Sequence, residues 1–118
     1  MIISVEELIK DQKSWNFREV QVLGYFKNEI ENISIRQNKS DLYDVIWVDL
    51  DRVNTKIIGF ELPAIYDPPC GYGEYFLVVI TGIFKIGKSG HFGLFDSSII
   101  NVKSIVTVDQ FSEEQEKN

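Results

Sequence analysis

One segment of the chain carries the letters of a nucleotide-binding site. Residues Gly82–Ser89 read G-I-F-K-I-G-K-S and satisfy the P-loop pattern G-x-x-x-x-G-K-[S/T]. A phosphate-binding loop lies between a strand and a helix, so that backbone N–H groups and the helix N-terminus converge on the phosphates. Here the motif continues the apolar alternation of Tyr75–Thr81, and Gly90–Gly93 cannot start a stable helix because glycine is costly there. We therefore predict that the match is accidental and that the chain is not an enzyme.

Two further residues could do chemistry, Cys70 and His91, the only cysteine and the only histidine. A nucleophilic thiol needs a nearby base, and His91 is the sole candidate for that role. Proline and glycine surround Cys70 and favour a turn, while a metal site needs several ligands at suitable spacing. We expect structural roles for both residues, with no metal site and no cofactor.

The composition restricts compartment and partner. The chain has 118 residues, with 12 basic and 18 acidic side chains and a net charge of −6. A sequence-independent grip on phosphate backbones comes from Lys and Arg, so nucleic acid is disfavoured as a partner. Residues Met1–Glu7 do not read as a secretory signal, and no apolar run approaches a membrane span. With a single cysteine, these features favour a cytoplasmic protein of one domain, residues 1–110, and a flexible acidic tail, residues 111–118.

The apolar periodicity predicts one short helix followed by strands. Ser4 and Glu7 form a capping box that begins a helix, which we expect to end near Lys13. Val20, Val22 and Phe26 alternate with polar residues, as on a half-buried strand, with Gly24 as a bend or bulge. The predicted strands are Arg18–Lys27, Ile30–Arg36, Val45–Leu50, Tyr75–Lys85 and Ser98–Val108, with Lys56–Leu62 as a further short strand or edge.

Five short strands, glycine inside two of them, and one flanking helix favour a mainly β fold. The prediction is a single small OB-fold-like antiparallel barrel with a short N-terminal helix, in which closure removes the sheet edges. Gly82 would bend one of these strands at a corner.

Five motifs resemble those of a family of small, mostly uncharacterised bacterial proteins with an OB-like barrel. They are V-Q-V-L-G-Y at Val20–Tyr25, W-V-D-L at Trp47–Leu50, V-V-I-T-G-I-F at Val78–Phe84, G-H-F-G-L-F at Gly90–Phe95 and I-I-N-V-K-S-I at Ile99–Ile105. The resemblance implies architecture and a glycine-rich loop between the last two strands, rather than a reaction. Some small acidic bacterial proteins of this size are immunity proteins, which block a toxin domain. The segment Glu29–Asp44 is shorter than the family pattern. If partner recognition lies in this segment, we expect a partner different from that of other members.

Acidic and aromatic side chains on or beside the middle strands are the candidate partner-binding residues. Carboxylates could pair with a basic partner and speed encounter, and Trp47 could anchor an interface because its neighbours already supply one apolar face. The candidates are Asp41, Tyr43, Asp44, Trp47, Asp49, Asp51, Glu61, Asp67, Tyr72 and Glu74.

We therefore expect a non-enzymatic protein-binding module, with a basic toxin domain as the hypothesised partner. The alternative is a protein that binds single-stranded nucleic acid, which would use a groove built from Lys27, Arg36, Lys85, Lys88 and Lys103. Nucleotide hydrolysis through Lys88 is the third class, and it requires the P-loop match to be real.

Overall fold

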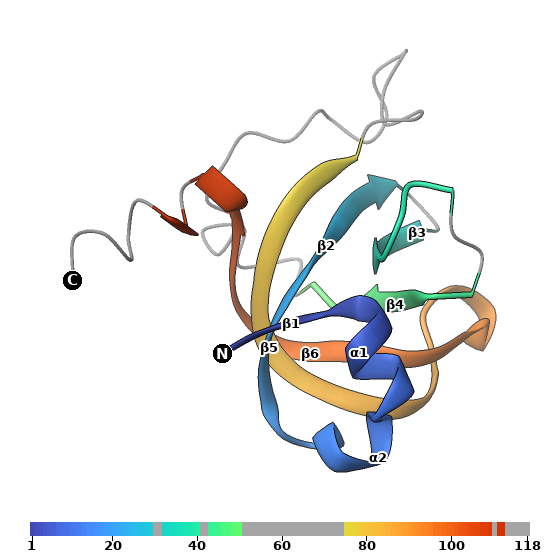
Figure 1. The fold of residues 1–118 in the computed structure, drawn as a ribbon. Helices are drawn as coiled ribbons and strands as arrows, with labels where there is room; N and C mark the ends of the chain where they lie inside the picture. Colours follow the sequence, from blue (N-terminus) through green and yellow to red (C-terminus); the bar gives the residue numbers. More distant parts are fainter. Residues whose placement is uncertain (30–31, 41–42, 51–74, 110, 113–118) are drawn as a thin grey trace.

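The structure is a computed structural model, and it describes residues 1–29, 32–40, 43–50, 75–109 and 111–112 (Figure 1). The elements are β1 (Ile2–Ser4), α1 (Val5–Lys10), α2 (Gln12–Trp15), β2 (Glu19–Glu29), β3 (Asn32–Arg36), β4 (Val45–Val48), β5 (Phe76–Ser89), a 3₁₀ turn (His91–Gly93) and β6 (Phe95–Thr107). The fold is mainly β, as expected. Among the described residues, no helix is long and apolar enough to cross a membrane.

The first helix begins at the predicted capping box. The Glu7 backbone N–H donates to Ser4 Oγ at 3.1 Å, and Ser4 Oγ donates to Glu7 Oε1 at 2.9 Å. Val5 and Leu8 form the apolar face of α1, and both are fully buried in the core. The cap thus satisfies the Glu7 backbone donor, which would otherwise lack a partner, while burial of the apolar face holds the helix against the sheet.

The strands form one six-stranded sheet in which five strands close into a ring of hydrogen bonds. The order is β1-β2-β3-β4-β6-β5, and β5 pairs again with β2. Most pairings are antiparallel, but β1–β2 and β4–β6 are parallel, which the sequence did not indicate. Figure 1 shows the long β5 curving around the sheet, with β2 beside its first half.

The core lies on one face of these strands, where the alternation predicted it. Val20, Val22 and Phe26 of β2 are buried, as are Ile46 and Val48 of β4. The same cluster includes Ile35 of β3, Phe84 of β5 and Ile99 of β6, among others. The residues between them point to the other face of the sheet. Ser34 and Ser98 on that face are buried as well, at 0% and 3% exposed.

Several predicted boundaries were wrong. β1 was missed, β4 ends at Val48, β5 continues to Ser89 and β6 begins at Phe95. Gly24 is not a bulge, because its pairing with Val78 is in regular register. Gly82 does lie at a register shift, between Thr81 and Ile83. The predicted strand Lys56–Leu62, the surroundings of Cys70 and the tail residues 113–118 lie outside the described residues.

Gly24 is instead a close-packing position. A Cβ atom there would meet Ile35 Cγ1 at 2.7 Å, Val5 Cγ2 at 2.8 Å and the Arg36 carbonyl oxygen at 2.9 Å. One of these contacts is backbone, and the other two are buried side chains. Only glycine lets α1 and β3 approach β2 this closely.

We expect Gly24→Ala to lower the free energy of unfolding by about 1–3 kcal/mol, because the added methyl group overpacks the core. The measurement is urea unfolding followed by tryptophan fluorescence. The matched control is Gln21→Ala on the outward face of the same strand, which should stay within about 0.5 kcal/mol of the parent. Equal effects of the two variants would contradict this packing role.

Candidate functional site

The connection between β5 and β6, residues 90–94, is a tight turn with an unusual backbone. We call it the β5–β6 turn. Gly90, Phe92 and Gly93 all have positive φ, at 77°, 54° and 64°. The Gly93 N–H donates to the Gly90 carbonyl at 3.1 Å, and the Leu94 N–H donates to the His91 carbonyl at 3.2 Å. Glycine adopts this conformation freely, whereas a phenylalanine there is strained.

Two aromatic side chains hold the turn against the sheet. The rings of Trp47 and Phe95 lie 5.2 Å apart at an interplanar angle of 54°. A Cβ atom on Gly90 would come within 2.7 Å of both rings, so the glycine backbone rests directly on them. The turn is thereby fixed to β4, although the two segments are far apart in the sequence.

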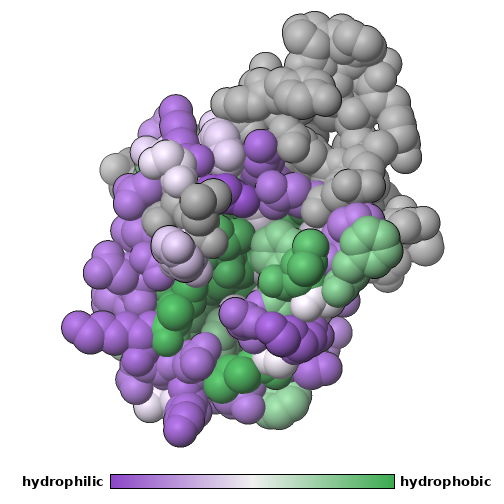
Figure 2. All heavy atoms as spheres, turned by 90° about the vertical axis from the view of Figure 1, so that its right-hand side faces the viewer, coloured by the Kyte–Doolittle hydropathy of each residue, from purple (hydrophilic) through white to green (hydrophobic). Residues whose placement is uncertain are grey.

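The turn presents two apolar side chains to solvent. Phe92 is 86% exposed and Leu94 is 72% exposed, while the His91 and Phe92 rings are tilted by 51° with centroids 4.1 Å apart. Figure 2 shows the side of the molecule on which the turn, β3 and β4 lie, with apolar atoms exposed between polar ones. A contiguous patch of exposed apolar groups marks an interaction site, so the exposure of both side chains on one turn makes it a candidate recognition element.

Beside the turn, the end of β5 passes over the outward face of β4 and β6 and encloses a hollow of about 160 Å³. The register shift between Ile86 and Ser89 moves the strand end out of the regular ladder. The lining residues are Trp47, Asp49, Lys85, Gly87, Lys88, Ser89, Gly90, Ser98 and Ile100. We call this site the hollow.

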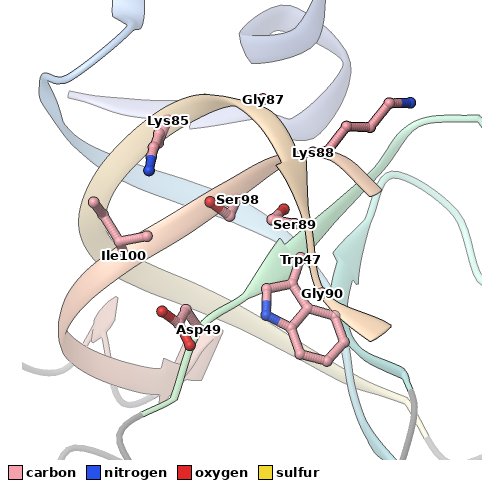
Figure 3. A pocket seen from close by; sticks show the side chains of 9 residues that line it. All are labelled: Trp47, Asp49, Lys85, Gly87, Lys88, Ser89, Gly90, Ser98 and Ile100. Atoms are coloured by element: carbon pink, nitrogen blue, oxygen red, sulfur yellow. The ribbon is translucent and has the colours of Figure 1, made fainter. Parts of the chain in front are cut away.

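The two lysines of the hollow differ in orientation. Lys88 extends away from the other lining side chains and pairs with Asp96 at 2.5 Å, whereas the Lys85 ammonium points toward the side where Asp49 and Ile100 lie (Figure 3).

The motif Gly82–Ser89 is strand throughout, and a three-residue 3₁₀ turn follows it instead of a helix. This segment therefore lacks the backbone geometry of a P-loop.

Outward-facing residues also form a row across the sheet. In register, Lys85 lies opposite Ser98, Ser98 beside Trp47, Trp47 opposite Ser34, and Ser34 opposite Lys27. We call these five residues the basic row. Ser34 and Ser98 are buried, at 0% and 3% exposed, whereas Lys27 and Trp47 are half-buried and Lys85 is exposed. Strands in a closed ring are tilted to its axis, so a row perpendicular to them runs obliquely along one side of the ring.

More cations gather around two tyrosines at the Lys27 end of the row. Lys27 Nζ lies 5.0 Å from the ring centroid of Tyr75 and 3.4 Å from its hydroxyl oxygen, and the Arg36 guanidinium lies 5.6 Å from the same ring centroid. Lys39 lies 5.5 Å from the Tyr25 ring centroid. Lys103 does not belong to this group, because it pairs with Glu19. Of the predicted basic groove, the structure thus brings Lys27 and Arg36 together at Tyr75 and places Lys85 at the opposite end of the row.

The predicted partner-binding residues have different fates. Tyr43 is 88% exposed, and Asp49 is exposed at the hollow. Asp44 is half-buried, and its backbone carbonyl accepts a hydrogen bond from the Gln37 N–H. Trp47 is half-buried beneath the turn, where its ring supports Gly90. Six candidates lie outside the described residues: Asp41, Asp51, Glu61, Asp67, Tyr72 and Glu74. Within the described ranges no group of three or more His, Cys, Asp or Glu side chains could hold a metal ion.

Sequence reasoning missed Phe92 and Leu94 as surface anchors. The available signal was the pair of flanking glycines, Gly90 and Gly93, which interrupts the apolar run and predicts a turn. The exposure of Phe92 and Leu94 depends on how the turn rests on Trp47, which no local sequence pattern contains.

No protein-family model, curated protein or solved structure matches the chain, so the family resemblance stays a prediction.

The strain at Phe92 can be tested separately from any partner. We expect Phe92→Gly to leave the free energy of unfolding unchanged or raise it by up to about 1 kcal/mol, because glycine relieves a strained φ while loosening the unfolded chain. Phe95→Ala, which removes the ring under Gly90, should instead cost at least about 1 kcal/mol. Thermal and urea unfolding measure both. A large loss of stability in Phe92→Gly would mean that Phe92 serves the fold.

Proposed function

We propose that this chain is a non-enzymatic protein-binding module whose docking element is the β5–β6 turn. The exposure of Phe92 and Leu94 on a backbone held by Trp47 and Phe95 carries this proposal. Aromatic anchors that become buried dominate the energetics of many interfaces. A turn that is rigid before binding loses little conformational entropy when it docks.

The proposed partner is a basic protein. The specific hypothesis is that this partner is a toxin domain, which the chain neutralises. The net charge of −6 favours encounter with a positively charged surface. Nuclease toxins are basic because they bind phosphate, so an acidic inhibitor complements them. Tyr43 and Asp49 are exposed in a way that suits this role, and the acidic candidates outside the described residues remain part of the proposal.

The proposed architecture is an OB-fold-like barrel. The ring order β2-β3-β4-β6-β5, closing back to β2, supports a five-stranded Greek-key barrel, the class to which OB-folds belong. The shift in register around the ring supports it too. The basic row leaves β5 at Lys85 and reaches Lys27 on β2, which pairs with β5 near Tyr75. One circuit of the ring therefore moves about ten residues along β5, as strongly tilted strands require.

The first test uses the protein that the adjacent gene encodes. Only the basic domain of that protein is expressed. We expect a complex by size-exclusion chromatography and calorimetry. Phe92→Ser combined with Leu94→Ser should weaken it at least about thirty-fold, because loss of one hot-spot side chain costs about 2 kcal/mol. The association rate should fall with added salt.

Phe17 provides the matched control. It is also an exposed phenylalanine with positive φ, at 65% exposure and 63°, but it lies between α2 and β2. Phe17→Ser should leave the affinity unchanged. If the double variant binds as tightly as the parent, the turn is not the docking element. If the adjacent gene product does not bind, the immunity hypothesis fails.

A second candidate function, binding of single-stranded nucleic acid, is favoured by the basic row. Such proteins combine cations that follow the backbone with aromatic rings on which bases stack. The row places Trp47 between Ser34 and Ser98, with a lysine at each end. With neighbouring strands about 4.8 Å apart, it spans about 20 Å.

For this candidate, fluorescence anisotropy with short oligothymidylate and oligouridylate at low salt should give saturable binding. Lys27→Gln and Lys85→Gln should each weaken binding and reduce the salt slope by about 0.7, the value for one lost phosphate contact on a single strand. Lys103→Gln, outside the row, serves as the control for charge alone. Absence of saturable binding, or equal effects of all three variants, would eliminate nucleic acid as the ligand.

A further inference from the structure

We propose that the hollow is a binding site for an oxyanion attached to a single flat ring, such as a phosphate monoester or a carboxylate on an aromatic group. This inference does not depend on the protein-binding proposal, because it concerns the cavity beside the β5–β6 turn and not the exposed side chains on it. The proposal rests on the lysine, the serine hydroxyl and the aromatic ring that line the hollow, and on its volume.

The charge is that of Lys85. Within the part of the chain that the structure describes, Lys85 makes no ion pair, and its ammonium points toward the Asp49 and Ile100 side of the hollow (Figure 3). Lys88, the lysine of the P-loop letters, is engaged with Asp96 instead. An oxyanion in the hollow would therefore meet Lys85, and a charge-assisted hydrogen bond is about twice as strong as a neutral one.

The hydroxyl is that of Ser98, which lies in register opposite Lys85. Ser98 is 3% exposed as a residue, and it lines the hollow. A serine hydroxyl both donates and accepts hydrogen bonds, so at this position it can donate to an oxyanion held in the hollow. The adjacent Ser89 hydroxyl is already used, since it donates to the Ser97 carbonyl at 3.2 Å.

The walls suit a flat ring. Trp47 lies on one side and Ile100 on the other, and Gly87 leaves open space, with nothing within 4 Å of a Cβ atom built there. The hollow measures about 160 Å³. A cavity of about 150 Å³ holds benzene, so one six-membered ring fits. Asp49, at the rim, would accept a hydrogen bond from a hydroxyl or amine on that ring.

The probe is phenyl phosphate, followed by ¹H–¹⁵N NMR of the full chain. We expect saturable shifts of the Trp47 indole N–H and the Gly90 and Ser98 amides below about 10 mM, a range appropriate to a fragment-sized ligand. Benzoate should shift the same signals. Phenol and inorganic phosphate, which each lack one half of the proposed ligand, should bind at least about ten-fold more weakly.

Four variants separate the contributions. Lys85→Gln and Ser98→Ala should weaken phenyl phosphate binding, the former by at least about ten-fold. Asp49→Asn should strengthen it, because a like charge is removed. Lys88→Gln, with the same charge change as Lys85→Gln, should stay within about two-fold. Loss of binding in Lys88→Gln but not in Lys85→Gln, or shifts absent from the hollow, would overturn the proposal.

A phosphate-bearing ring can be a free small molecule or the end of a nucleic acid strand. A 5′-phosphorylated oligothymidylate whose binding falls in both Lys85→Gln and Lys27→Gln would identify the strand as the source. Dependence on Lys85 alone would identify the small molecule. Either result supports the oxyanion site, and independence from Lys85 contradicts it.

Discussion

The fold depends on the pairing of β2 with β5, which closes the sheet. Glu19–Phe26 lie opposite Phe76–Ile83 in unbroken antiparallel register. This contact turns an open sheet into a ring, removes two exposed edges and places the apolar face of each strand inside. Because β5 must also pair with β6, it is the longest strand, at 14 residues, and its end extends beyond the β2 contact. That extension forms both the hollow and the turn.

Trp47 connects the two candidate sites. Its ring supports Gly90 at the base of the turn and at the same time lines the hollow, so one side chain positions Phe92 and shapes the cavity. The Trp47 ring is therefore a structural element that the turn and the hollow share.

Sequence patterns predicted the features that depend only on residues close together in the chain. The Ser4 cap and the alternation of Val20, Val22 and Phe26 follow from hydrogen bonding and strand periodicity, and both were confirmed. β1 was missed because three residues carry no periodicity and its partner Gln21–Leu23 is distant in the sequence. The exposure of Phe92 was missed for the same reason, since it results from packing between segments far apart in the chain.

The P-loop letters show how local placement outweighs both motif and net charge. At physiological salt the Debye length is about 8 Å, so a ligand in the hollow is affected by Lys85 and Asp49 far more than by the total of −6. The net charge alone disfavoured nucleic acid as a partner, but the sheet register places lysines at both ends of a row through Trp47. An acidic protein can thus attract a basic partner at long range and hold an oxyanion at short range, because the two interactions sample different charges.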